Sequence, residues 1–264
     1  MDFSKINVSA DGKTLCEVYD VDNLVIPEGV TKIEKCAASQ RSIVSVEIPD
    51  SVEEIGKEAF RICRDLQRVT IGAGVKKMGA EAFAGCGSLN SVTIKEGVKL
   101  IGESAFWKDA ALEQIALPDS LTKISKAAFQ STSLTALRIP ANVKSIGADA
   151  FNVRKKEGKT GPSVLTTVEF APGCKLTTIE ESAFKDASIE TLVLPDKLQT
   201  LGDGAFAGCT SLKSVHIPAG LTSMGYKPFD GCTALTTITI DPANPAFVLQ
   251  DGKLFTKDLK KQVI

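Results

Sequence analysis

Cysteine and histidine are the residue types in this chain that are best suited to chemistry. Four of the seven cysteines share one position, three residues after a phenylalanine, and these are Cys63, Cys86, Cys209 and Cys232. Thiols that recur at one position can bind a metal, form disulfides or pack as small apolar groups. The remaining cysteines are Cys16, Cys36 and Cys174, and the single histidine is His216.

The cysteine spacing favours buried structural thiols over a metal centre. The chain has no Cys-x-x-Cys pair, and zinc requires ligands that converge from several directions, which His216 does not supply from its different position. We therefore expect neither a metal nor a cofactor. If neighbouring copies lie on adjacent strands, about 4.8 Å apart, disulfides between Cys63 and Cys86 and between Cys209 and Cys232 remain the alternative. The odd total leaves at least one free thiol.

His216 invites comparison with a catalytic triad. Ser214 stands two residues before it, but no acid occupies the equivalent neighbouring positions, so a nucleophile, base and carboxylate do not converge. We expect His216 to be a surface residue and the protein not to be an enzyme.

Composition narrows the classes of partner. The 264 residues are 43% hydrophobic and 24% charged, which is typical of a folded protein with a large core. The 31 basic residues nearly balance the 32 acidic ones, so the chain has no net positive charge that would attract nucleic acid. No apolar run reaches the ~20 residues needed to cross a bilayer, and the first residues do not read as a secretory signal. We expect a soluble chain with no nucleic-acid partner and no direct membrane insertion.

The elements that position these residues follow from an internal repeat. An Ala-Phe or Pro-Phe pair recurs with intervals of 23, 23, 23, 22, 33, 22 and 23 residues, and its phenylalanines are Phe60, Phe83, Phe106, Phe129, Phe151, Phe184, Phe206 and Phe229. A unit of this length cannot bury its own apolar face, so it must stack on its neighbours in a solenoid. Because the phenylalanines stay in phase with the repeat, we predict that they form a buried column.

Each repeat contains an alternating segment of the kind Val215-His216-Ile217-Pro218, which predicts a half-buried strand ended by proline. About ten such segments, ending from Ile26 to Ile240, predict a mainly β solenoid with one parallel sheet of stacked rungs and little helix. A second apolar segment in each repeat predicts a short strand or turn on the opposite wall. We expect one repeat domain over 1–264, with an N-terminal hairpin in 1–22, repeats in 23–240, an insertion near 152–163, and in 241–264 a hairpin and the possible start of a further repeat.

The unit reads approximately L-x-x-I-x-I-P-x-x-V-x-x-I-G-x-x-A-F-x-x-C, and over nearly the whole chain it resembles the BspA-like leucine-rich repeat family. The segments around Asp11-Gly12 and Asp251-Gly252 resemble the hairpins that interrupt such arrays. This resemblance implies a bacterial surface or secreted interaction protein and no catalytic residues.

Two candidate binding sites follow. The first is the outward face of the predicted sheet, whose small hydroxyl residues are interspersed with larger polar ones: Glu47, Arg68, Gln114, Arg138, Glu169 and His216. The second is the insertion, with its basic residues Arg154, Lys155, Lys156 and Lys159. The leading hypothesis is a cell-surface or secreted adhesion scaffold that binds a host or microbial protein, with a glycan as the alternative ligand. The alternative is a structural spacer of a larger surface protein, without a ligand of its own.

Overall fold

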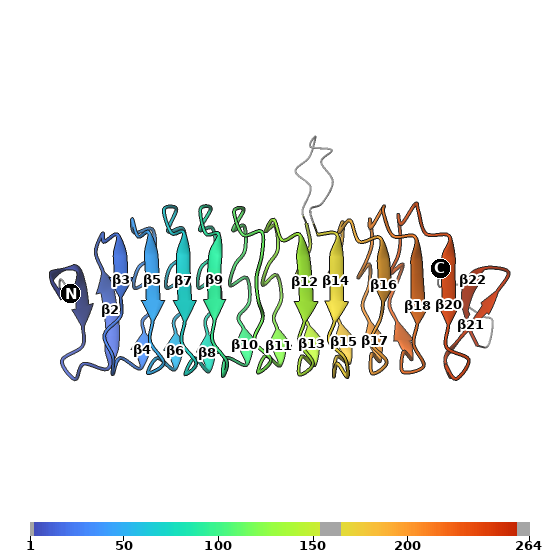
Figure 1. Ribbon diagram of the computed structural model, residues 1–264, viewed down its shortest axis with the longest axis horizontal. Helices are drawn as coiled ribbons and strands as arrows, with labels where there is room; N and C mark the ends of the chain where they lie inside the picture. Colours follow the sequence, from blue (N-terminus) through green and yellow to red (C-terminus); the bar gives the residue numbers. More distant parts are fainter. Residues whose placement is uncertain (1–2, 154–164, 258–264) are drawn as a thin grey trace. The chain divides into compact units, whose positions relative to one another are not determined.

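The computed structural model describes residues 3–153 and 165–257, which divide into two compact units, 1–134 and 135–264. Over these residues the elements are one short 3-10 helix, η1 (Phe3–Lys5), and the strands β1 to β22 (Figure 1). The chain therefore folds as a solenoid of short strands joined by turns, with almost no helix over the described residues, as the repeat predicts.

Within each unit, the longer strands of the repeats lie on one wall, which we call the outer sheet of that unit. In unit 1 it comprises β3 (Asn23–Val25), β5 (Ser45–Ile48), β7 (Arg68–Ile71) and β9 (Ser91–Ile94), hydrogen-bonded in that order. All pairs are parallel and in register, so that equivalent residues such as Val46 and Val69 stand side by side. In unit 2 it comprises β12 (Ala136–Ile139), β14 (Thr167–Phe170), β16 (Thr191–Val193), β18 (Ser214–Ile217) and β20 (Thr237–Ile240).

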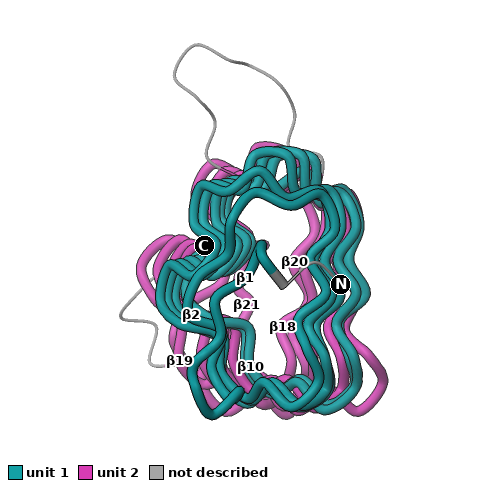
Figure 2. The backbone as a smooth tube through the Cα atoms, turned by 90° about the vertical axis from the view of Figure 1, so that its left-hand side faces the viewer, with its two compact units in different colours: residues 1–134 teal, residues 135–264 magenta. Residues whose placement is uncertain are grey.

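Two-residue strands form the opposite wall. They are β4 (Lys32–Ile33), β6 (Glu54–Ile55), β8 (Lys77–Met78), β10 (Leu100–Ile101) and β11 (Lys123–Ile124) in unit 1. In unit 2 they are β13 (Ser145–Ile146), β15 (Thr178–Ile179), β17 (Thr200–Leu201) and β19 (Ser223–Met224). Within unit 2, β18 and β20 lie on one side of the turn and β19 on the other (Figure 2). The prediction of a second, short-stranded wall is confirmed.

Antiparallel hairpins stand near both ends of the described chain. The first pairs β1 (Ile6–Val8) with β2 (Thr14–Val18), and the second pairs β21 (Phe247–Gln250) with β22 (Lys253–Thr256). Asp251 and Gly252 turn the second hairpin with φ of 50° and 74°, the left-handed pair that a tight two-residue turn requires. Both hairpins confirm the expectation from the Asp-Gly signals.

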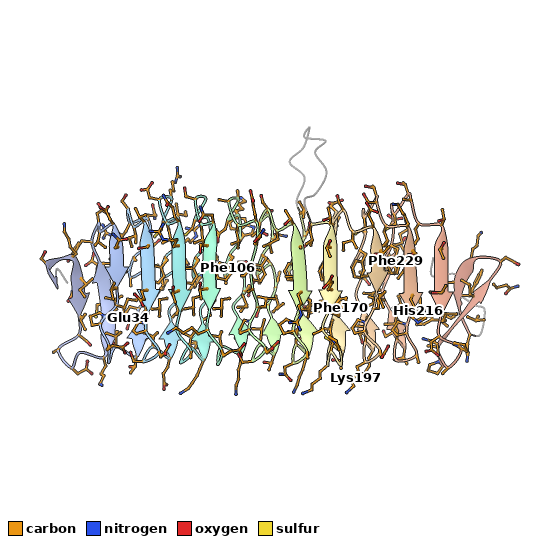
Figure 3. All side chains as sticks on the ribbon, viewed as in Figure 1. Glu34, Phe106, Phe170, Lys197, His216 and Phe229 are labelled. Atoms are coloured by element: carbon orange, nitrogen blue, oxygen red, sulfur yellow. The ribbon has the colours of Figure 1, made fainter. Side chains whose placement is uncertain are left out.

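Phenylalanine rings fill the space between the walls. In unit 1, the rings of Phe60, Phe83, Phe106 and Phe129 stack with centroids 5.2–5.4 Å apart. In unit 2, a second run extends through Phe151, Phe184, Phe206 and Phe229 with spacings of 5.1–5.7 Å. Figure 3 shows Phe106 and Phe229 among the side chains of their units. Each ring is at most 5% exposed, so the predicted buried column is confirmed.

One repeat differs from the expectation. The segment 113–117 forms no strand, although Leu112 and Leu117 are buried like their equivalents. The inward residue at its centre, Ile115, is only half-buried, and the outward Ala116 has a low preference for extended structure. Packing of the leucines, rather than strand pairing, keeps this turn in place.

Candidate functional site

The alternation of the outer strands places the predicted face residues outside. In unit 1, Glu47 lies on β5, Arg68 on β7 and Gln114 in the segment without a strand, and all three are exposed. Their inward neighbours Val46 and Val69 are 3% and 2% exposed. Substitutions at these three positions would therefore leave the core beneath the face unchanged.

In unit 2 the register brings the remaining face residues into two groups. Arg138 and Glu169 are both exposed and stand opposite each other on β12 and β14. His216 lies on β18 between Val193 and Thr239, and its Nδ1 is 2.9 Å from the hydroxyl of Thr239. His216 is half-buried rather than fully exposed as expected, because this contact holds the ring against the sheet.

The basic candidate residues Arg154, Lys155, Lys156 and Lys159 lie outside the described residues. Their role in binding stays a prediction.

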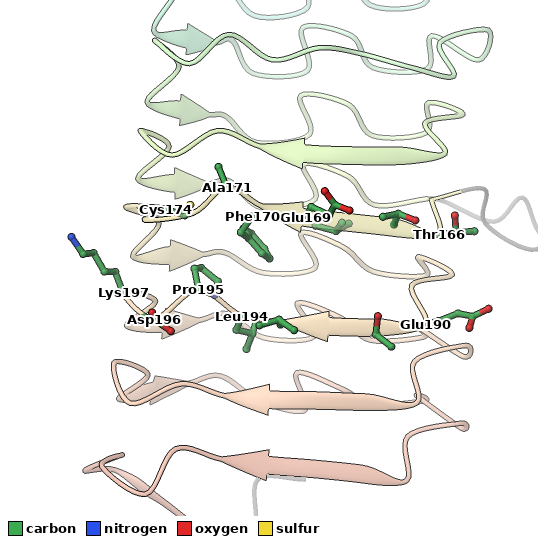
Figure 4. Close-up of a pocket in the computed structure, with 14 residues that line it drawn as sticks. Thr166, Glu169, Phe170, Ala171, Cys174, Glu190, Leu194, Pro195, Asp196 and Lys197 are labelled. Carbon is green, nitrogen blue, oxygen red and sulfur yellow. The ribbon is translucent and has the colours of Figure 1, made fainter.

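The outer sheet of unit 2 is interrupted by a cleft. Within the described part of this unit, β12 pairs with β14, β16 pairs with β18, and β18 pairs with β20, but β14 and β16 are not hydrogen-bonded to each other. A cleft of about 760 Å³ opens between these two strands. Figure 4 shows Glu169 and Phe170 on β14, and Glu190 and Leu194 on the neighbouring turn that contains β16.

A longer connection accompanies the interruption. Residues 171–177 join β14 to β15, whereas 140–144 join β12 to β13 and 218–222 join β18 to β19. The two extra residues widen this turn, and Cys174, which lines the cleft, is buried beneath it. Not all of the additional residues between Phe151 and Phe184 therefore belong to the insertion at 152–163. The lengthened interval is the sequence signal that could have revealed the cleft.

The cleft combines polar walls with an exposed apolar side chain. Its carboxylates are Glu169, Glu190 and Asp196, and its one ammonium group is Lys197. The Lys213 ammonium donates to Glu190 at 2.8 Å and lowers the pKa of that carboxyl. Val193 is 71% exposed between these groups. This arrangement offers a net negative rim and an apolar contact point to a partner.

The shared cysteine position is a column of thiols that donate hydrogen bonds to the preceding turn. Cys63, Cys86 and Cys209 are fully buried and Cys232 is half-buried. The Sγ atoms of Cys86, Cys209 and Cys232 lie 3.2–3.4 Å from the carbonyl oxygens of Phe60, Phe184 and Phe206, and that of Cys63 lies 3.0 Å from Ala38 O. The predicted burial is confirmed for Cys63, Cys86 and Cys209, whereas Cys232 is more exposed than predicted. The neighbouring thiol and burial raise the pKa of Cys86 and of Cys209.

The sequence analysis missed Asp109, which occupies the cysteine position of its turn. Its side chain is fully buried, and Oδ1 accepts a hydrogen bond from the Cys86 amide at 2.8 Å. The other carboxylate oxygen has no protein hydrogen-bond partner. Burial raises the pKa of Asp109 well above its ordinary value. The sequence signal that could have revealed its burial is its position three residues after Phe106, where four other repeats have a cysteine.

Over residues 3–153 and 165–257, no three side chains of metal-binding type come close enough to hold an ion. Among the same residues, no helix has the length and hydropathy to cross a bilayer.

The comparison with protein families identifies the same repeat. The model for the BspA type leucine rich repeat region matches residues 31–156 and 163–248 in six copies. No curated protein sequence matches the chain. Similar solved structures include a leucine rich cell surface protein from Faecalibacterium prausnitzii, with 25% identity over 89% of this chain and 92% of that one and a TM-score of 0.41.

Two further structures are similar at lower identity. The leucine rich repeat protein of T. pallidum has 22% identity over 87% of this chain and 86% of that one, with a TM-score of 0.44. The pneumococcal vaccine antigen PcpA has 19% identity over 93% of this chain and 49% of that one, with a TM-score of 0.37. Because the repeat model covers most of the sequence and the repeats fold as stacked turns, the chain belongs to the BspA-type leucine-rich repeat family.

Proposed function

We propose that this protein is a non-enzymatic binding scaffold, displayed on a bacterial surface or secreted, that holds a protein partner on its outer sheet. Membership of a leucine-rich repeat scaffold family supports the general role. The observation that carries the specific proposal is the cleft between β14 and β16, where the regular pairing of the sheet is broken.

The residues that line the cleft are of the kinds found at the centre of a protein–protein interface. Val193 is a large apolar side chain, 71% exposed, on a face that carries mostly polar groups, and it is more exposed than the equivalent Val25, at 39%. An apolar anchor surrounded by polar groups is the usual arrangement at the centre of a protein interface. Glu169 and Glu190 beside it favour a partner segment that carries Lys or Arg next to an apolar residue.

The test compares two matched double variants of the whole chain. In the cleft variant, Glu169→Gln is combined with Val193→Ser. In the control, Glu47→Gln is combined with Val25→Ser, the same substitutions at register neighbours on β5 and β3 of unit 1. Each immobilised protein is incubated with extracellular-matrix and mucin fractions, and the affinity for the captured partner is then measured with purified components.

We expect the cleft variant to bind at least tenfold more weakly and the control to bind like the wild type. Equal weakening of both variants would assign binding to the sheet face as a whole. Unchanged affinity in both would move the site away from this face. No captured partner would favour the structural spacer.

A further inference from the structure

A second hollow lies in unit 1, next to the turns that follow Phe60, Phe83 and Phe106. The middle turn contributes only small residues, which are Ala84, Gly85, Gly87 and Ser88, whereas the turns on either side carry long side chains. Arg61, Ile62 and Arg64 form one wall and Trp107 and Lys108 form the other, on either side of an open hollow of about 620 Å³. This is within the range of small-ligand sites.

The charges that line this hollow are all positive. The side chains of Arg61, Arg64 and Lys108 line it, and no carboxylate does. Arg61 is paired with Glu81 at 2.9 Å, and the Lys108 ammonium lies 4.0 Å from the centre of the Trp107 ring. Arg64 is exposed and forms no hydrogen bond or ion pair with the described residues. An anionic group bound here would meet Arg64 and Lys108 across the hollow.

The hollow is held in shape by hydrogen bonds from outside it. Trp107 Nε1 donates to Gln130 Oε1 at 3.1 Å, which fixes the indole. The floor is fixed because Gly85 N donates to Trp107 O at 2.7 Å and Cys86 N donates to the buried Asp109 at 2.8 Å. A site that is ordered before binding loses little conformational entropy on binding.

We propose that this hollow binds a glycan through a pyranose ring that carries a carboxylate. Arg pairs with a carboxylate through two parallel hydrogen bonds, and Arg64 is available to do so. Ile62 and Trp107 supply apolar surface for the C–H groups of the ring. An extended acidic peptide fits less well, because the floor amides of Gly85 and Cys86 are already bonded and offer no strand edge.

A smaller adjoining hollow of about 310 Å³ extends the site. It is lined by Gln40, Arg41, Ser42 and Asp65 and shares Ile62 and Arg64 with the first. Arg64 therefore stands between two hollows, and a second sugar unit can follow the first along this surface.

The chain itself supplies the probe for the test. Trp107 is the only tryptophan among the 264 residues, so fluorescence excited at the indole band reports on this hollow alone. The whole chain is titrated separately with glucuronic acid, N-acetylneuraminic acid, neutral glucose and an acidic hexapeptide, at low ionic strength. The two acidic sugars distinguish a uronic acid from a sialic acid as the source of the carboxylate.

Three variants complete the test. Arg64→Gln removes the unpaired guanidinium. Gly87→Leu fills the hollow from its floor, where an added Cβ has no atom within 4 Å, so the backbone need not move. Lys123→Gln, on β11 of the opposite wall, removes one positive charge and leaves the hollow intact. Circular dichroism verifies that each variant is folded.

We expect a saturable fluorescence change with at least one acidic sugar and none with glucose. Arg64→Gln and Gly87→Leu should each weaken this binding at least tenfold, and Lys123→Gln should leave it within twofold. Absence of a saturable response to both acidic sugars, tighter binding of the peptide, or full affinity in the Gly87→Leu variant would overturn the proposal. Neither Arg64 nor Gly87 touches the cleft between β14 and β16, so these results are independent of the sheet-face function.

Discussion

The amide of Cys86 donates its hydrogen bond to the carboxylate of Asp109, 23 residues later, at 2.8 Å. In the turns of Cys63, Cys209 and Cys232 the corresponding amide donates to the carbonyl of the phenylalanine three residues before it. The Cys86 amide therefore bonds to the next turn, through Asp109, instead of to a carbonyl within its own turn. The carboxylate stands where neighbouring repeats carry a thiol, in a position with no access to water.

The first prediction concerns the pH dependence that this buried acid confers. Burial raises the pKa of Asp109 well above the ordinary value, although the amides of Cys86 and Gly85 oppose the shift. An unfolded Asp titrates near ~3.9, so below that pH both states are protonated and the contribution to stability is fully present. It is lost as the pH rises from ~4 through the folded pKa, because only the unfolded state releases its proton readily.

The Asp109→Asn variant keeps the shape and removes the titration. We expect it to be about 1–3 kcal/mol more stable than the wild type near pH 8, and the difference to shrink toward pH 4. Urea unfolding at several pH values measures this difference, with Glu103→Gln at an exposed position as the control. A difference that does not vary with pH would contradict the raised pKa.

The second prediction concerns the phenylalanine column. Phe83 stacks on Phe60 at 5.2 Å and on Phe106 at 5.4 Å, so Phe83→Ala leaves a cavity with rings on both sides. We expect a loss of ~3–5 kcal/mol in the free energy of unfolding. Phe170→Ala is the matched control, since this ring is half-buried at the cleft and outside the column. Similar losses in both variants would show that the column is not the main source of stability.

The third prediction concerns thiol reactivity. Cys36 is exposed and Cys16 and Cys232 are half-buried, whereas Cys63, Cys86, Cys174 and Cys209 are buried. A thiol reagent should modify Cys36 quickly and the four buried groups only as the protein opens. After denaturation without reductant we expect seven reactive thiols. A count of five would establish one disulfide in the native protein, and mass spectrometry of the digest would distinguish Cys63–Cys86 from Cys209–Cys232.

The fourth prediction is that the exposed residues of the outer sheet contribute to binding and not to the stability of the fold. The outward residues Arg68, Gln114, Arg138 and Glu169 are all exposed. Changing all four to Ser should alter the free energy of unfolding by no more than about ±0.5 kcal/mol per site, while affinity for a sheet-face partner falls at least tenfold. Calorimetry and a binding titration on the same sample measure both quantities. Unfolding at a much lower temperature would mean that these side chains contribute to the fold.

Periodicity is sufficient to predict the walls and the column, since each turn repeats the environment of the one before. Val46 lies between Leu24 and Val69, and Val69 lies between Val46 and Val92, so one inward assignment decides all three valines. The same argument placed Cys63 and Cys86 in a buried position. It could not show that Asp109 would remain buried in that position, because hydropathy alone favours an exposed aspartate.

Neither hollow was predicted from the sequence, for a related reason. Each depends on a difference between adjacent turns rather than on what the turns share. The cleft accompanies two extra residues after β14, and the hollow beside Trp107 arises because Gly85 and Gly87 are flanked by turns with long side chains. A repeat consensus averages over such differences, whereas the structure places them side by side.

The missing pairing between β14 and β16 also affects amide hydrogen exchange. The amides on the β14 side of β16 have no strand partner and stay hydrated, whereas β18 is paired on both sides. Deuterium should therefore enter β16 faster than β18, and unit 2 should begin to open at this position. A partner that bridges the two strands would slow exchange throughout both, including at amides that it does not contact.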